Sequence, residues 1–210
     1  LVWGPLHGFA VAGWVRRRTE GVLALEDAPL YKALHRLERR GDVVLALGRT
    51  DPLKNFALTR AAWDRLAPRP ELWLYGVEPE LADAPGIRYV EAPTDAEVIG
   101  LLQQATVFVQ TSHHEGFCLP ILEAMAAGVP VVCTDADGNR DFCEDGVNCL
   151  MPMDDPAAVA DALARVLGET ALRERLAAAG RETAERHRWA HRARELDAYF
   201  RSLAPVEATR

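Results

Sequence analysis

Residues 115–128 read EGFCLPILEAMAAG, and residues 129–134 continue with VPVVCT. Proline is favoured in the first turn of a helix, so Pro120 predicts that a helix begins close to it. The apolar, β-branched run that follows predicts a buried strand. Two glutamates, Glu115 and Glu123, stand eight residues apart in this apolar segment, one before the helix and one inside its first turns. The stretch therefore predicts a loop, a helix and a strand, with two carboxylates that need partners.

The same alternation of strand and helix extends from Asp42 onward. Further strands are predicted at 43–48, 71–76, 86–92 and 106–112, with an edge strand near 148–151. Helices are predicted over 55–67, 94–105, with a capping box at Thr94 and Glu97, and 139–144. Residues 156–203 are almost wholly helical, with breaks at Gly168, Gly180 and around Trp189. Strands separated by helices of this length predict an α/β fold with a doubly wound, parallel, Rossmann-like sheet.

The bulk composition is that of an ordinary globular protein, with 49% hydrophobic and 26% charged residues in a chain of 210. No apolar run approaches the roughly 18 residues that a membrane helix needs, and no signal peptide is visible, so we expect a cytoplasmic protein. The net charge is −7, yet residues 1–41 carry seven basic and four acidic side chains. Because an acidic body repels nucleic acid, any DNA affinity would have to lie in this basic segment.

The cysteines are spaced along the chain without a CxxC pair. They are Cys118, Cys133, Cys143 and Cys149. This spacing argues against a zinc site, and the missing secretory signal argues against a disulfide framework. The sequence therefore predicts reduced, buried thiols.

Positive charge follows the first predicted strand. Arg49 and Lys54 stand five residues apart in one loop, where they could grip a diphosphate together, arginine through its planar fork and lysine as a point charge. The backbone N–H groups of residues 118–121 lie at a predicted helix start and could face the same anion. Both loops follow strands of a parallel sheet, so they are expected in one crevice beyond the strand ends.

The two glutamates complete this crevice, Glu115 at its mouth and Glu123 along its wall. Carboxylates accept hydrogen bonds from sugar hydroxyls, and a ligand with hydroxyls at both ends and a diphosphate between them would satisfy every group. The predicted ligand is a nucleotide-activated sugar. His113 and His114 stand beside Glu115, but adjacent residues at a strand end point to opposite sides, so a shared metal is not expected.

Four segments resemble one known family, and they stand in the family's order. They are LGRTDPLK (47–54), HHEGFCLPILEAMAAGVPVV (113–132), DGNRDFCEDGVNCL (137–150) and ERHRWAHRARELDAYF (185–200). They resemble the C-terminal, donor-binding half of retaining GT-B glycosyltransferases of the group 1, or family 4, type. The resemblance covers residues 42–203 and leaves 204–210 as a tail. It implies one half of a GT-B fold.

The resemblance also implies roles for individual residues. Glu115 would lie against the donor sugar and Glu123 would hold the ribose hydroxyls, while Arg49 and Lys54 would neutralise the departing diphosphate. Further donor contacts would come from the backbone of Gly116, Phe117, Cys118 and Leu119, with Glu91 and Ala92 near the base. Cys118 stands where the family often has glycine, but its contact would be through the backbone. The implied reaction is transfer with retention, and it needs no metal or other cofactor besides the nucleotide-diphosphate sugar itself.

Residues 1–41 do not continue this resemblance. The run WGPLHGFAVAGWVRRRTEGVLALEDAPLYKALHRLERRG (3–41) resembles the winged-helix core of PadR-type transcription regulators, with LYKALHRLERRG (30–41) as its recognition helix. The segment predicts a short helical fragment before the sheet, closed by Gly41. It stands where the glycosyltransferase family has its acceptor-binding domain.

Three hypotheses follow for the whole chain. The first is a donor-binding half of a glycosyltransferase, inactive as an isolated chain and active with an acceptor domain supplied elsewhere; the acceptor could be a glycan, a lipid or a small molecule. The second is a fragment of a DNA-binding regulator fused to a nucleotide-sugar-sensing domain. The third is an inactive, rearranged fragment. The wing and the dimerisation helix of the regulators are missing, so nucleic acid is not the expected partner.

Overall fold

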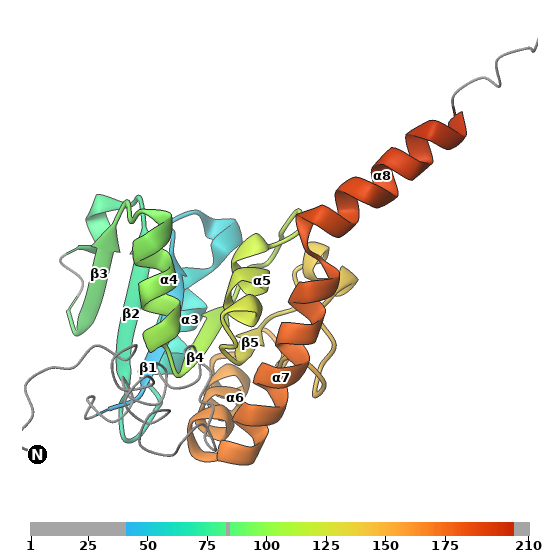
Figure 1. Ribbon diagram of the computed structural model, residues 1–210. Coiled ribbons are helices and arrows are strands. Elements are labelled where there is room, and N and C mark those ends of the chain that lie inside the picture. Colours follow the sequence, from blue (N-terminus) through green and yellow to red (C-terminus); the bar gives the residue numbers. More distant parts are fainter. Residues whose placement is uncertain (1–40, 83–84, 204–210) are drawn as a thin grey trace, which may run out of the picture.

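Five parallel strands form the centre of the computed structural model, which describes residues 41–82 and 85–203 (Figure 1). They are β1 (Val43–Gly48), β2 (Glu71–Gly76), β3 (Ile87–Glu91), β4 (Val107–Gln110) and β5 (Val131–Cys133). Their order across the sheet is β3-β2-β1-β4-β5, and every neighbouring pair is parallel. This order confirms the predicted doubly wound, Rossmann-like sheet.

Helices cover both faces of this sheet. They are α3 (Phe56–Trp63), α4 (Asp95–Gln104), α5 (Leu119–Ala126), α6 (Pro156–Gly168), α7 (Thr170–Arg186) and α8 (Trp189–Leu203), with short 3-10 turns η1 (Pro52–Lys54), η2 (Pro79–Leu81) and η3 (Gly138–Asp141). The cores on the two faces are separate: α3 and α6 pack on one, and α4 and α5 on the other. Because helices cover both faces, β1 is apolar along almost its whole length.

Helix α4 begins as its sequence predicts. The hydroxyl oxygen of Thr94 accepts a hydrogen bond from the backbone N–H of Glu97, whose carboxylate accepts one from the Thr94 N–H. This capping box satisfies donors that the first helical turn would leave unpaired.

Three predicted boundaries are wrong. Gly180 does not break a helix, because α7 runs through it and the missing side chain lets α7 approach α5: a Cβ there would lie 3.1 Å from Met125 Cγ. Residues 148–151 form no strand, only two isolated bridges, from Leu150 to Val132 and from Cys149 to Asp145. The helix predicted at 139–144 is the shorter turn η3.

Helix α8 extends away from the rest of the domain (Figure 1). Its large apolar side chains are exposed, and they are Trp189, Leu196, Tyr199 and Phe200. In the described part of the chain, no helix combines the length and apolar character needed to cross a membrane. The predictions for residues 1–40 and for the tail 204–210 lie outside the described residues.

Candidate functional site

The loops that follow β1 and β4 meet at the carboxyl edge of the sheet. Strand order reverses between these two strands, and such switch points are where ligands bind in open α/β sheets. The described non-glycine residues with positive φ all stand in loops that follow sheet strands on this side; they are Asn55, Ala92, Cys118 and Asp137. A left-handed backbone conformation is costly for residues with a Cβ, and residues held in it are often found at functional sites. We therefore take this edge of the sheet as the candidate site.

Glu115 is the most tightly held side chain of the site. Its carboxylate accepts a hydrogen bond from the Lys54 ammonium at 2.8 Å, and on its other oxygen from the Ser112 hydroxyl at 2.6 Å and the Gln110 amide at 3.2 Å. The Glu115 side chain is only 9% exposed. The sequence predicted Lys54 and Glu115 in one crevice, and the structure joins them directly.

Lys54 reaches this position because its loop is ordered locally. Asp51 caps the turn η1 by accepting a hydrogen bond from the Leu53 N–H at 2.8 Å, and the Leu53 carbonyl accepts one from the His113 N–H at 2.8 Å. The second bond fastens the loop after β1 to the loop after β4. The Lys54 side chain remains 23% exposed.

Arg49 points to a different partner. Its Nε lies 4.0 Å from a carboxylate oxygen of Glu78, and the Thr50 hydroxyl donates to the other oxygen at 3.1 Å. The two cations of the loop are therefore held by different carboxylates, Arg49 by Glu78 and Lys54 by Glu115. Their joint grip on a diphosphate stays a prediction.

The loop 116–118 and the start of α5 follow Glu115. Cys118 is the N-cap with φ of 67°, a conformation that favours glycine, and its side chain makes no capping bond. Gly138 presses on the loop from the other side: a Cβ there would lie 2.4 Å from the Glu115 carbonyl oxygen. Leu119 is 60% exposed at the helix start. The helix therefore begins at the crevice with backbone donors not taken by a side-chain cap.

Phe117 belongs to a small aromatic group. Its ring lies 5.2 Å from that of Phe142 in an edge-to-face arrangement, and Phe142 lies 5.7 Å from His187 at the end of α7. Sequence reasoning missed this group, because its members are far apart in the chain. The ring contact of Phe117 packs the loop 116–118 against this group, and Gly116 in the same loop is exposed.

Glu123 differs from Glu115, because its side chain is exposed on α5. Partial burial and the nearby charge of Asp95 raise the pKa of Glu123. The Tyr75 hydroxyl is buried without a hydrogen-bond partner among the described residues, and the pKa of Tyr75 is raised by burial and by the charge of Glu123. Tyr75, which sequence reasoning also missed, thus lies near the wall predicted to bind ribose.

Glu91 and Ala92 lie at the carboxyl end of β3, one strand beyond β2. Ala92 has a φ of 43°, and its N–H donates to the Gly76 carbonyl at 2.6 Å, which fixes the loop against β2. The structure thus places both residues at the same edge of the sheet as Lys54. Their proximity to a base stays a prediction.

His113 and His114 pair with different carboxylates. Nδ1 of His113 lies 2.8 Å from Asp154, and Nδ1 of His114 lies 2.8 Å from Asp137. Among the described residues, the side chains close enough together to hold a metal ion are three cysteines on the α4/α5 side of the sheet, and neither histidine belongs to that group. All four cysteines are buried and none forms a disulfide, in agreement with the predicted reduced, buried thiols.

The sheet is parallel and doubly wound, and a lysine, a buried glutamate and a helix start lie at its switch point. These features define a Rossmann-like α/β domain with a ligand site at the carboxyl edge of its sheet. A family model described as glycosyl transferases group 1 matches residues 41–169. The chain therefore belongs to the group 1 glycosyltransferase family.

Curated relatives match over most of the chain. It is 32% identical over 216 residues to D-inositol 3-phosphate glycosyltransferase of Nocardioides sp., covering 89% of this chain and 47% of that protein. It is 33% identical over 198 residues to phosphatidyl-myo-inositol mannosyltransferase of Mycobacterium tuberculosis, covering 85% and 52%. The chain thus spans about half the length of the curated relatives it matches.

Solved structures show the same fold. Sucrose-phosphate synthase from Thermosynechococcus elongatus matches with a TM-score of 0.73 and 25% identity, over 82% of this chain and 48% of that one. HepE from Anabaena, solved in complex with UDP and glucose, matches with a TM-score of 0.70 and 20% identity, over 83% and 52%. These likenesses identify the sheet as one half of a GT-B fold.

Proposed function

We propose that this domain binds a nucleoside-diphosphate sugar at the carboxyl edge of its sheet and transfers the glycosyl group with retention. The observation that carries the proposal is the Lys54–Glu115 pair beneath the start of α5. Lys54 offers a positive charge to a diphosphate, and Glu115 offers a fixed acceptor to a sugar hydroxyl. The UDP bound by the Anabaena structure supports this ligand class.

The proposed chemistry is electrostatic. As the bond between the anomeric carbon and the diphosphate breaks, an acceptor hydroxyl oxygen bonds to that carbon; the leaving group keeps the electron pair, gains negative charge and takes up the acceptor's proton. Lys54, Arg49 and the N–H groups at the start of α5 would stabilise that charge, which is worth most in a site that excludes water. Arg49 would have to turn away from Glu78 to take part. No metal or other cofactor has a role in this proposal.

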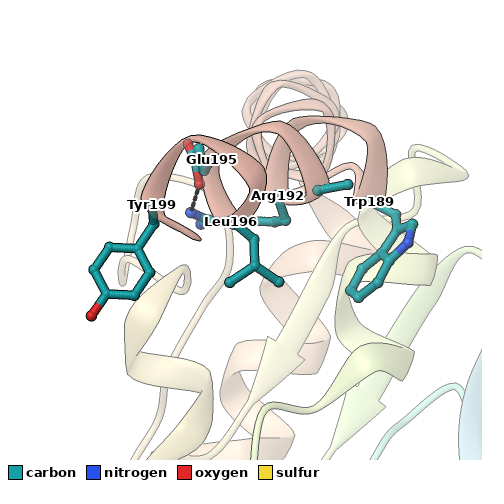
Figure 2. A pocket seen from close by; sticks show the side chains of 6 residues that line it. Trp189, Arg192, Glu195, Leu196 and Tyr199 are labelled. Carbon is teal, nitrogen blue, oxygen red and sulfur yellow. Dashed lines mark hydrogen bonds and ion pairs between the residues drawn. The ribbon is translucent and has the colours of Figure 1, made fainter. Parts of the chain in front are cut away.

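The proposed enzyme also needs an acceptor-binding domain. Helix α8 exposes 81% of Trp189 and 51% of Leu196, which line one shallow apolar pocket with Tyr199 (Figure 2). A helix face of this kind is normally covered. Because the curated relatives are about twice as long as this chain, we assign this face to the acceptor-binding half.

The alternative of a DNA-binding regulator rests on residues 1–41. The alignment with the Nocardioides relative covers 89% of the chain, so it must extend into this segment. A glycosyltransferase relative that continues past the predicted domain boundary favours the transferase hypothesis over a junction with a regulator.

Calorimetry on the full chain with UDP, GDP, ADP and dTDP tests the proposal. We expect at least one nucleotide to bind and Glu123→Ala to weaken it. Glu174→Ala, on the exposed surface of α7, is the matched control and should bind as the wild type does. Absence of binding to all four nucleotides would overturn the proposed site.

A further inference from the structure

Three buried sulfur atoms lie together on the face of the sheet covered by α4 and α5. The Sγ atoms of Cys133, Cys143 and Cys149 all lie within 4.8 Å of one another. Cys133 ends β5, Cys143 follows η3, and Cys149 ends the loop after it. Backbone bonds hold these segments together: the Cys133 N–H donates to Leu150 and the Gly146 N–H to Cys149, both at 2.9 Å. The cluster is therefore part of the folded framework.

The spacing of these sulfurs fits a single metal ion. Two sulfurs bound to one ion at about 2.3 Å each lie about 3.8 to 4.0 Å apart. The Sγ atoms of Cys133 and Cys143 are already 3.8 Å apart. The third sulfur would need to move by less than about 1 Å to complete the same triangle. Such a triangle can form without rearranging the backbone.

The chemistry of the cluster selects the ion. Its three ligand atoms are all sulfur, which favours soft cations over oxygen-seeking ones. The side chains are 1%, 7% and 0% exposed, and the surrounding core is apolar. This leaves little room for a water ligand. We propose that Cys133, Cys143 and Cys149 bind one Cu⁺ ion, a soft d10 cation that three thiolates can hold, in a structural site separate from the crevice.

Such an ion would stabilise the segment that packs against the loop 116–118. Cys143 follows Phe142, whose ring packs on Phe117, and Gly138 presses on the Glu115 carbonyl. An ion joining β5 to this segment stabilises the folded state by mass action, because the unfolded chain lacks the assembled triangle. Binding therefore should raise Tm without being required for nucleotide binding.

The test is a titration of the reduced, metal-free full chain under anaerobic conditions. One arm uses Cu⁺ and the other Zn²⁺, each buffered by a coloured chelator that competes for the ion. We expect one Cu⁺ per chain, with release of thiol protons and a rise in Tm, and weaker binding of Zn²⁺, which takes four ligands. Failure of Cu⁺ to bind, or tighter binding of Zn²⁺ than of Cu⁺, overturns the proposal.

Variants locate the binding. Cys149→Ser and Cys143→Ser should each weaken binding at least about 100-fold, since even loss of a second-shell partner costs 10- to 100-fold. Cys118→Ser is the matched control, because Cys118 is buried but outside the cluster, and it should bind as the wild type does. Circular dichroism checks that each variant is folded. Equal binding by wild type and folded Cys149→Ser, or loss of binding in folded Cys118→Ser, places the ion elsewhere and contradicts the site.

Discussion

The loop before α5 and the outer face of α5 each carry one glutamate, and the fold treats the two differently. Glu115 is buried and its carboxylate accepts hydrogen bonds from Lys54, Ser112 and Gln110. Glu123 is exposed, and its pKa is raised by partial burial and by Asp95. The first carboxylate is already paired in the folded chain, whereas the second is exposed and is the one we propose to bind ribose.

This difference separates two uses of a carboxylate. A paired, buried glutamate fixes the geometry of a site, because its partners hold it in one position before any ligand binds. An exposed glutamate with a raised pKa contributes little to folding and is available to sugar hydroxyls. Substitutions at Glu115 should therefore affect stability and activity together, while those at Glu123 should affect ligand affinity alone.

The largest effect on stability is expected for Glu115→Ala. Its removal leaves the Lys54 ammonium without its carboxylate and takes the acceptor from Ser112 and Gln110. Hydrogen bonds to charged groups contribute about 1.5 to 3 kcal/mol, so we expect a loss of about 2 kcal/mol in the free energy of unfolding. Urea denaturation measures it, with Glu174→Ala as control. A loss equal to that of the control would mean that the pair does not hold the site.

Lys54→Met should lower turnover, and it should also destabilise the fold because it leaves the buried Glu115 carboxylate without its cation. Loss of one group that stabilises transition-state charge costs roughly 10²- to 10³-fold in kcat, and we expect a loss of this size. The assay needs the acceptor-binding half, and Arg60→Met in α3 is a control for loss of a partly exposed, salt-bridged cation from the surface. If Lys54→Met and the control reduce kcat equally, Lys54 does not act on the leaving group.

Glu123→Gln should leave stability almost unchanged and weaken nucleotide binding. Surface substitutions usually change stability by less than about 0.5 kcal/mol. Loss of a charge-assisted bond to ribose costs about 1.5 to 3 kcal/mol, or roughly 10- to 100-fold in Kd. Calorimetry and urea denaturation on the same variant check both parts. If Glu123→Gln is clearly destabilised but binds the nucleotide normally, then Glu123 supports the fold rather than the ligand, contrary to the proposal.

The raised pKa of Glu123 gives this contrast a pH dependence. Its folded pKa lies above the ordinary value of 4.5, so the folded state is penalised once the carboxylate ionises. Relative to Glu123→Gln, the wild type should lose stability as pH rises from about 4.5 through the raised pKa. Its nucleotide affinity should change in the opposite direction, because ribose needs the ionised form. Urea denaturation and calorimetry at several pH values measure both trends, and parallel pH profiles for wild type and variant would contradict them.

Much of the fold could be predicted because local patterns agree with it. The strand β1 and the Thr94 capping box depend on neighbouring residues, and both are as predicted. Gly180 was misjudged because its reason is the close packing of α7 on Met125, a contact distant in sequence. Residues 148–151 were predicted as a strand, yet they form only two isolated bridges, because pairing depends on the partner segment.

The candidate site was predictable in its members rather than in its contacts. Loop positions after parallel strands were enough to place Lys54 and Glu115 at one edge of the sheet. The sequence could not show that Arg49 turns to Glu78, or that the buried Tyr75 hydroxyl lacks a partner among the described residues. The sequence also did not predict the cysteine cluster. The spacings of 10 and 6 residues between Cys133, Cys143 and Cys149 do not indicate that the folded chain brings their sulfur atoms together.

The smallest effect is expected at Cys118, which stands between the two glutamates. The left-handed backbone of Cys118 costs about 1 to 2 kcal/mol of stability, and Cys118→Gly should remove this cost. The same substitution removes a buried side chain, which should lower stability by a similar amount. We therefore expect unchanged stability within about 1 kcal/mol. Nucleotide affinity should also be unchanged, because the proposed contact is made by the backbone. Cys118→Val is the contrasting variant: a β-branched residue tolerates this φ poorly and should destabilise the fold. If Cys118→Gly weakens binding while Cys118→Val does not, the side chain rather than the backbone meets the ligand.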